Sequence, residues 1–277
     1  MIPADFDYVR PSTLTDAIRA GAVPGAVVLA GGQSLIPDLK VRRKRTRLLV
    51  DLASVPGLDS ITVEPDSVRI GAMARQTDIV TRLGSRIPLL AEVARAAADP
   101  MVRRRGTLVG ACCEAAPGGD WVAAALALDA VMLTEGVGGR RDIPLADFVT
   151  GPGTTALGPD EIATSIRLRI PEPRMVSAYR KVKHAAVGWS IGSVAVLLGE
   201  RAAEHRVAVS GATPYPQRMP TLEAAIGRID RGNATDLAEA VEDALADLRY
   251  QGDYYASASF RRKRLAVLLR RTLAELG

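Results

Sequence analysis

The segment Pro171-Glu172-Pro173 constrains the fold more than any other feature of this sequence. Proline has a fixed φ and no backbone N–H donor, so this segment interrupts any helix or central strand. Before it, short apolar strands alternate with helical patterns, whereas after it three strand-like runs precede the helices. The sequence therefore predicts two domains, residues 1–172 and 173–277, in a fold of the α+β class.

Residues 1–53 are predicted to form a small βαβ subdomain. Apolar runs over 26–30 and 47–52 have the length of strands, and a segment with helical spacing, 34–39, lies between them. A further short helix is predicted over 14–20. Because parallel strands need a crossover connection, this order indicates a small parallel sheet.

Residues 54–172 are predicted to form a larger α+β subdomain, which begins with a hairpin whose turn is Pro65-Asp66. Thr77 and Asp120 are predicted N-caps, since their side-chain oxygens can accept hydrogen bonds from the first turn of a helix. Residues 101–119 are rich in glycine and other small residues, so they are predicted to turn tightly or to approach a ligand. The predicted helices cover 77–83, 87–98 (ended by Asp99-Pro100) and 121–128, and the predicted strands cover 131–133 and 162–170.

Residues 173–277 are predicted to form a second domain of three strands and several helices. The strands cover 178–182, 191–198 and 206–210. Two helical stripes of apolar residues follow, with a spacing that places each stripe on one helix face. These stripes consist of Leu237, Val241, Ala244 and Leu248, and of Leu265, Leu268, Leu269 and Leu273.

Composition is that of an ordinary globular protein. Hydrophobic residues make up 48% and charged residues 24% of the 277 residues. The longest apolar runs, Val122–Ala127 and Val194–Leu198, are far shorter than the roughly 18 residues that cross a bilayer, so no membrane span is expected. The first residues, Met1 to Asp7, carry acids where a signal peptide has a basic segment. We therefore expect a cytoplasmic protein.

The chain is basic, with a net charge of +5 and an isoelectric point of about 9.5. Nucleic-acid binding is disfavoured, because aromatic residues make up only 4% of the chain and the basic residues are scattered along it. The densest basic run, from Lys40 to Arg47, is predicted to be a solvated loop or a docking surface. It gives a mild preference for acidic partners.

Two nucleophile patterns give competing hypotheses. Residues 188–192 fit GxSxG, in which Ser190 would be a hydrolase nucleophile with His205 downstream. Cys112 or Cys113 with His184 would form a thiol nucleophile pair. The β-rich run after Ser190 favours a serine at a strand start instead, and adjacent cysteines favour small buried side chains over a disulfide. No metal centre is expected from so few cysteines and histidines.

A stronger candidate is an anion-binding loop at Ala30-Gly31-Gly32-Gln33-Ser34-Leu35. An apolar strand ends there in two glycines and a helix begins at Ser34, so successive backbone N–H groups can converge on a phosphate. Glycine admits the positive φ that such a nest requires, although a plain Gly-Gly turn is the alternative for this loop alone. A second loop, Arg105–Gly110, could supply donors from the opposite side, and Asp120 could accept hydrogen bonds from sugar hydroxyls. Together these segments predict a site for an extended dinucleotide.

Residues along the whole chain resemble a known family, the FAD-binding medium subunits of molybdenum hydroxylases, which includes the carbon monoxide dehydrogenase medium subunit and the xanthine dehydrogenase flavin domain. Ala30–Leu35 is similar to the family's AGGQSL loop, Ile70–Met73 to its IGAM turn, and Val102–Gly110 to its VRxRGTIGG loop. Further similar positions are Pro117, Asp120, Leu128-Asp129-Ala130, Ile143 through Phe148, Thr155 through Glu161, Tyr179, Lys181, Trp189, Asp253, Ser257, Arg261 and Arg262.

This resemblance implies a fold of the vanillyl-alcohol-oxidase (PCMH) type, with FAD between the N-terminal domain and a C-terminal α+β flavoprotein domain. It implies an oxidoreductase subunit that passes electrons from the [2Fe-2S] clusters of a small partner subunit through FAD to an external acceptor, while a molybdopterin large subunit oxidises the substrate. Gly31–Leu35 and Thr107–Gly110 would hold the diphosphate, Asp120 would bind sugar or ribityl hydroxyls, and Lys181 would lie near the isoalloxazine. The FAD-binding residues implied are Ala30, Gly31, Gly32, Gln33, Ser34, Leu35, Thr107, Gly110, Asp120 and Lys181.

Several positions differ from the family's pattern. Val109 and Ala111 replace a glycine and an asparagine of the second loop, and Ala116 and Gly188 stand where relatives often carry polar or acidic residues. A β-branched residue resists the positive φ that glycine allows. These differences leave an alternative function open: a standalone descendant of the same fold, acting as a pathway enzyme or scaffold with altered or lost flavin binding.

Overall fold

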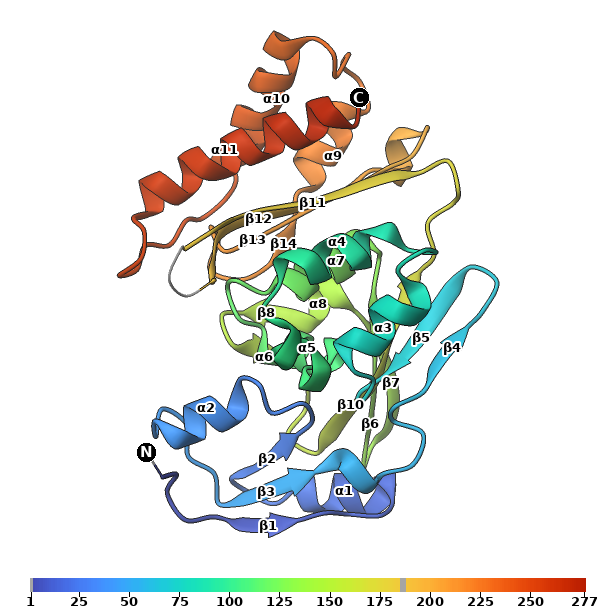
Figure 1. Cartoon of the computed structure of the whole chain (residues 1–277), viewed down its shortest axis with the longest axis vertical. Coiled ribbons are helices and arrows are strands. Elements are labelled where there is room, and N and C mark those ends of the chain that lie inside the picture. The colour runs from blue at the N-terminus through green and yellow to red at the C-terminus, as the bar shows by residue number, and fades with distance from the viewer. Residues whose placement is uncertain (1, 185–187) are drawn as a thin grey trace.

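A computed structural model describes residues 2–184 and 188–277 of the chain. The N-terminal sheet lies at one end of the molecule, the central unit lies in the middle, and the C-terminal sheet with its helices lies at the other end (Figure 1). All strands of each sheet come from one continuous stretch of the sequence. We therefore propose the boundaries 1–53, 54–172 and 173–277 for these three units. No helix of the described chain is long and apolar enough to cross a membrane.

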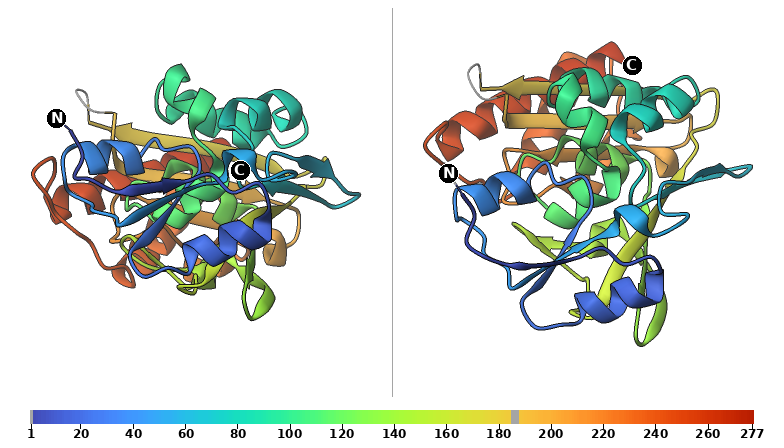
Figure 2. Two further views of the ribbon diagram at one scale, coloured as in Figure 1. Left: turned by 90° about the horizontal axis from the view of Figure 1, so that it is seen from below. Right: turned by 60° about the horizontal axis from the view of Figure 1, so that its bottom comes forward.

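The N-terminal unit is a three-stranded parallel sheet in the order β1-β3-β2. Thr13 caps its first helix, because the Thr13 side chain accepts a hydrogen bond from the N–H of Asp16. This helix, α1, packs beside the long strand β10 (Glu161–Arg169) of the central unit (Figure 2). The other elements are β1 (Asp7–Val9), α1 (Leu14–Gly21), β2 (Ala26–Leu29), α2 (Leu35–Lys40), β3 (Leu48–Asp51) and η1 (Leu52–Ser54).

The central unit is built on a five-stranded antiparallel sheet in the order β4-β5-β10-β6-β7. Its strands besides β10 are β4 (Ile61–Val63), β5 (Ser67–Gly71), β6 (Val131–Gly136) and β7 (Gly139–Pro144), and a small hairpin pairs β8 (Val149–Gly151) with β9 (Thr154–Thr155). Its helices are α3 (Gln76–Leu83), α4 (Pro88–Ala96), α5 (Pro100–Arg105), α6 (Leu108–Glu114), α7 (Asp120–Ala127) and α8 (Leu145–Phe148).

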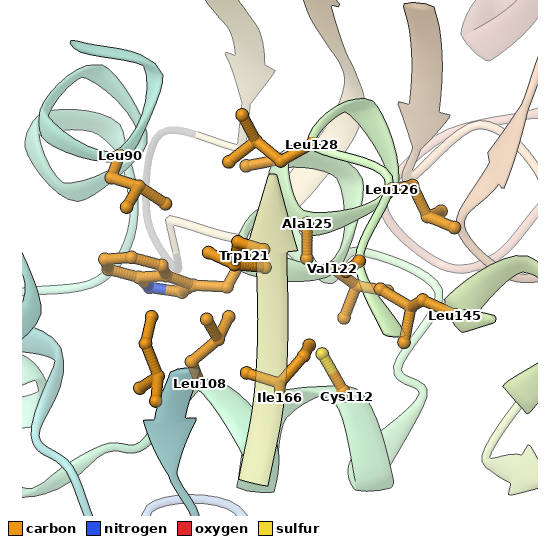
Figure 3. Packing of buried hydrophobic residues seen from close by; sticks show 14 of the residues in the cluster. Leu90, Leu108, Cys112, Trp121, Val122, Ala125, Leu126, Leu128, Leu145 and Ile166 are labelled. Atoms are coloured by element: carbon orange, nitrogen blue, oxygen red, sulfur yellow. The ribbon is translucent and has the colours of Figure 1, made fainter. Parts of the chain in front are cut away.

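Helix α7 is the centre of the largest core cluster. All of its residues from Trp121 to Ala127 are buried. Trp121 and Val122 pack with Leu108 and Ile166 around the N-terminal half of the helix (Figure 3). A helix that is apolar on every side is stable only when it is covered all round, and α7 is covered by the central unit and by the C-terminal sheet. This burial holds Asp120, the first residue of α7, in a fixed position.

The C-terminal unit is a four-stranded antiparallel sheet in the order β11-β12-β13-β14. One face of the sheet packs against α4 and α7, and α10 and α11 lie on the other side of it (Figure 1). Both faces are therefore covered, which explains why every residue of β12 is buried. The elements are β11 (Val176–Lys183), β12 (Ser190–Leu198), η2 (Ala202–Glu204), β13 (Arg206–Ser210), β14 (Gln217–Arg218), α9 (Pro220–Ile226), α10 (Ala234–Ala246) and α11 (Ala258–Glu275).

The predicted elements are present, but several boundaries were wrong. Arg75 is the N-cap of α3, so Thr77 lies inside that helix, and Gly119 is the N-cap of α7. Residues 101–119 were predicted to turn tightly or to approach a ligand, and much of this segment is helical, because it contains α6 and all of α5 but Pro100. Asp99 and Thr107 cap these two helices, because each side chain accepts a hydrogen bond from a backbone N–H three residues later.

His205 makes the stability of the C-terminal unit depend on pH. The residue connects η2 to β13 in the chain and is only 4% exposed. Burial, reinforced by the charge of Arg231, lowers the pKa of the imidazole from its usual 6.5. The unfolded chain therefore binds the proton more readily, so the free energy of unfolding falls as the pH drops below 6.5.

We expect His205→Gln to flatten this dependence, and urea denaturation between about pH 5 and pH 7.5 measures it. His184→Gln is the control, because it removes the other histidine of the chain. An equally steep decline in the His205 variant would contradict the assignment.

Candidate cofactor site

Two glycine-containing loops from distant parts of the sequence meet next to the central unit. A Cβ atom added to Gly31 would lie 2.4 Å from the carbonyl oxygen of Arg105 and 2.9 Å from the Cα of Gly106. Distances this short to backbone atoms leave no room for a side chain at Gly31. The structure thus places the first predicted loop, 30–35, directly against the second, 105–110.

The first loop presents backbone N–H groups that have no protein partner. Across residues 2–184 and 188–277, the N–H groups of Gly32, Gln33 and Ser34 donate to no other group. Gly32 has a φ of +72°, a conformation that lets successive N–H groups point to one side of the chain. The Gln33 side chain steadies the turn by donating from Nε2 to the carbonyl oxygen of Gly31 over 3.2 Å. The loop can therefore bind an anion through its main chain alone.

The second loop is the start of α6, and Thr107 caps that helix. The N–H of Gly110 donates to Thr107 Oγ1 over 3.1 Å, so this N–H is already used within the protein. A Cβ atom at Gly110 would lie 2.6 Å from Thr107 Oγ1, so glycine at this position leaves room for the cap. Val109 is helical and buried, and it is absent from the residues with positive φ in the described chain. The expected conflict between a β-branched residue and positive φ therefore does not occur at Val109.

Both loops line one cavity of about 540 Å³. Cofactor and ligand sites commonly measure roughly 300–1,000 Å³. Part of the lining is apolar, including Val28, Leu157 and Ile162, and part is formed by Gly119, Asp120 and Trp121. Lys44 also lines the cavity, but its Nζ lies 3.5 Å from Glu114 Oε2 in an ion pair. A bound diphosphate would therefore depend on backbone N–H groups more than on side-chain charge.

A buried cluster joins this cavity to the C-terminal sheet. Asp120 Oδ1 accepts a hydrogen bond from the Tyr179 hydroxyl over 2.5 Å, and Asp120 Oδ2 accepts one from Lys181 Nζ over 2.7 Å. The side chains of Lys181 and Asp120 are only 4% and 11% exposed. Burial raises the pKa of Asp120, whereas the charge of Lys181 acts in the opposite direction. Burial and the neighbouring carboxylate raise the pKa of Tyr179, so its hydroxyl stays protonated and can donate.

Nine of the ten predicted FAD-binding residues line the cavity. The exception is Lys181, which contacts the site through Asp120. The sequence reasoning missed Arg75 and Gln76, which hold the second loop in place. The Arg75 guanidinium donates to the carbonyl oxygen of Arg105 over 2.6 Å, and the N–H of Gln76 donates to the carbonyl oxygen of Gly106 over 2.9 Å. No sequence pattern marks either residue, because both contacts cross between elements far apart in the chain.

The competing nucleophiles lie in unsuitable surroundings. Ser190 begins β12, whereas a hydrolase elbow requires a strand-to-helix turn, and the residue is only 6% exposed. Cys112 is fully buried. Cys113 lines the cavity, but burial raises its pKa to about 12, so little thiolate forms near neutral pH. The local chemistry therefore favours ligand binding over nucleophilic catalysis.

Comparisons with known proteins assign both parts of the chain to one family of flavin-binding subunits. Residues 4–173 match the model of the FAD binding domain in molybdopterin dehydrogenase, and residues 177–276 match the CO dehydrogenase flavoprotein C-terminal domain. The nicotine 6-hydroxylase medium subunit of Paenarthrobacter nicotinovorans is 32% identical, with 98% of this chain and 96% of that protein covered. The carbon monoxide dehydrogenase medium chain of Hydrogenophaga pseudoflava is 33% identical, with 92% and 93% covered.

Solved structures give the same picture. A structure of carbon monoxide dehydrogenase from Hydrogenophaga pseudoflava matches with a TM-score of 0.93 at 31% identity, covering 100% of this chain and 98% of that chain. Quinoline 2-oxidoreductase from Pseudomonas putida 86 matches with a TM-score of 0.89 at 26% identity, covering 100% and 98%. The predicted fold class and the predicted cofactor, FAD, are confirmed by these matches.

Proposed function

Because the chain belongs to the family of the FAD binding domain in molybdopterin dehydrogenase, we propose that it is the electron-transferring medium subunit of a molybdenum hydroxylase. It would receive electrons from the [2Fe-2S] clusters of a small partner subunit and hand them to an external acceptor. A molybdopterin large subunit would oxidise the substrate. FAD supplies a centre that accepts electrons singly and releases them in pairs. The cytoplasmic location stays a prediction.

The observation that carries this proposal is the direct contact of the two loops around a cavity with unpaired N–H groups. The N–H groups of Gly32, Gln33 and Ser34 would donate to the diphosphate of FAD. Thr107 and Gly110 would form the opposite wall. Asp120 would accept hydrogen bonds from ribityl or sugar hydroxyls, and Lys181 would keep Asp120 ionised and oriented.

The first test is the flavin content of the full chain. We expect the purified protein to show the visible absorption of an oxidised flavin, and denaturation to release FAD in a ratio near one per chain. The fit of the cavity to a dinucleotide predicts that chain isolated without flavin takes up added FAD. Failure to bind FAD at saturating concentration would contradict the proposal.

Co-purification distinguishes this function from the standalone alternative. A medium subunit is expected to associate with an iron–sulfur chain and a molybdopterin chain when it is purified from cells that make its partners. A protein that is active alone, without either chain, would favour the standalone enzyme or scaffold instead.

Gly32→Val is expected to weaken FAD binding about tenfold or more, since strain of about 1.4 kcal/mol corresponds to a factor of ten. A valine at position 32 would have to adopt a φ of +72°. Its Cβ atom would also lie 3.1 Å from side-chain atoms of Ile36 and Leu29. Gly57→Val is the control, because Gly57 has a φ of +80° with nothing within 4 Å and does not line the cavity. Flavin titration measures both variants, and equal affinity for FAD would refute the role of this loop.

A further inference from the structure

A second groove, of about 690 Å³, adjoins the first loop. The loop 30–33 lines both this groove and the cofactor cavity, so it forms a shared wall between them. The groove is lined by Lys40 at the end of α2, by Val41 after it, and by Arg75 and Arg105. We call the surface formed by Lys40, Val41, Arg75 and Arg105 the basic face.

The cations of this groove lack acidic partners of their own. Among the residues that the structure describes, Lys40, Arg75 and Arg105 form no ion pair within 4.0 Å. Burial lowers the pKa of Arg75, and the positive charge of the nearby Arg105 lowers it further. One carboxylate lines the groove, that of Asp51, and it already accepts hydrogen bonds from the Tyr8 hydroxyl over 2.7 Å and from the N–H of Ala53 over 2.9 Å.

Other charges near the groove leave an excess of positive charge. Asp59 and Asp78 lie near enough to Arg75 to attract it, but neither forms an ion pair with it. Arg43 and Lys44, which follow Lys40 in the sequence, are paired with Asp38 and Glu114. Arg45 and Arg104 add further exposed cations without an ion pair in the described chain. An anionic partner would balance this excess.

Exposed apolar side chains accompany these cations. Val41 is 44% exposed, and Tyr8, whose hydroxyl contacts Asp51, is 55% exposed. Helix α5 carries Arg103, Arg104 and Arg105, buries none of its residues and leaves Met101 68% exposed. Arginine, methionine and aromatic residues are the types enriched at protein interfaces. Their combination over α2 and α5 extends beyond the groove, which fits a protein surface better than a small anion.

We propose that the basic face binds an acidic segment of the iron–sulfur subunit of the complex. This inference rests on the proposed function, in which that subunit delivers electrons to this chain. A partner seated on the basic face lies against the wall of the cofactor cavity, whereas a partner on α10 or α11 is separated from the cavity by the C-terminal sheet. The large subunit, a second copy of this chain and a small anion are the other occupants that the test separates.

Zero-length cross-linking of the assembled complex tests the location. The chain contains five lysines, and Lys40 and Lys44 are the two in the predicted basic run. A carbodiimide joins lysine ammonium groups to carboxylates in direct contact. We expect peptides that link Lys40 to an aspartate or glutamate of the subunit carrying the iron–sulfur cysteines. Links from Lys40 only to the molybdopterin subunit, or to a second copy of this chain, would overturn the proposal.

Charge removal tests the energetics. We expect Lys40→Gln with Arg45→Gln, an exposed cation of the same basic run, to weaken binding of the purified iron–sulfur subunit about tenfold at low salt and to reduce its salt dependence. FAD content should stay at the wild-type value, because neither side chain lines the cofactor cavity. The matched control, Lys263→Gln with Arg271→Gln, removes the same charge from α11. Equal affinity of both double variants would overturn the proposal.

The flavin content of each sample separates the two possible failures. A wild-type chain that contains no FAD, or that never associates with an iron–sulfur subunit, contradicts the proposed function and this inference together. A flavin-loaded chain that binds the subunit equally well in both double variants contradicts only the docking site. Binding of inorganic phosphate that is lost in the Lys40 and Arg45 variant, with subunit binding unchanged, assigns the groove to a small anion instead.

Discussion

Replacing Gly31 by alanine is expected to abolish FAD binding and to lower the free energy of unfolding by about 2 kcal/mol. The added methyl group would lie 2.4 Å from the carbonyl oxygen of Arg105. This neighbour is backbone, which cannot swing aside as the end of a flexible side chain can. The second loop is also held by Arg75 and Gln76, so it resists displacement. Relief of the clash therefore requires the two walls of the diphosphate site to separate.

Two measurements test the Gly31→Ala variant: the amount of FAD released per chain, and the midpoint of urea denaturation. Gly138→Ala is the matched control, because a Cβ atom there meets nothing within 4 Å and the backbone has no positive φ. A Gly31 variant that keeps full flavin content would show that the loops are not the walls of the FAD site. A variant that loses FAD while Gly138→Ala keeps it supports the clamp.

Lys181→Met is expected to lower the free energy of unfolding by about 3 to 5 kcal/mol, as is usual when one partner of a buried ion pair is removed. Asp120 would remain buried next to the Tyr179 hydroxyl without its cation. The pKa of Asp120, already raised by burial, would rise further because the opposing charge of Lys181 is gone. The folded variant then binds a proton more readily than the unfolded chain, so its loss of stability is largest at high pH and shrinks as the pH falls towards that pKa.

A double-mutant cycle isolates the pair. Lys181→Met combined with Asp120→Asn should cost less than the sum of the two single changes, because neither buried charge is left alone. Lys183→Met is the control: it lies two residues along the same strand, is exposed and should change stability by less than about 0.5 kcal/mol. Additive costs in the cycle would contradict a coupled ion pair, and a pH-independent cost would contradict the charge of Asp120.

Much of the site could be predicted because its signals are local. The strand before Gly31 and the glycine pair predict a turn with unpaired N–H groups. The structure contains the strand and this turn. The hairpin at Pro65-Asp66 and the apolar helix after Asp120 are likewise visible as short-range patterns. Weak elements escaped prediction. Strand β1, for example, has only three residues and no buried one, so it lacks the alternation that marks a strand.

The helices α5 and α6 show why a locally sound prediction can fail. Glycine and small residues over 101–119 indicated tight turns, since such residues admit unusual backbone angles. In the folded chain, the side-chain caps at Asp99 and Thr107 stabilise two short helices, and burial of Leu108, Val109 and Cys112 secures the second. Packing against the central unit outweighs the low helix propensity of glycine at position 110.

The sequence by itself predicted the two loops and a dinucleotide as the class of ligand, because these depend on residue types within a few positions of one another. Tertiary structure alone decided that Gly31 lies against Arg105 and that Tyr179 and Lys181 share Asp120. It also decided that the cations of α2 and α5 face one groove. The residues in these contacts lie too far apart in the sequence for the repeat of a helix or a strand to relate them. They form only when sheets and helices pack to exclude water, which fixes the distances between side chains far apart in the chain.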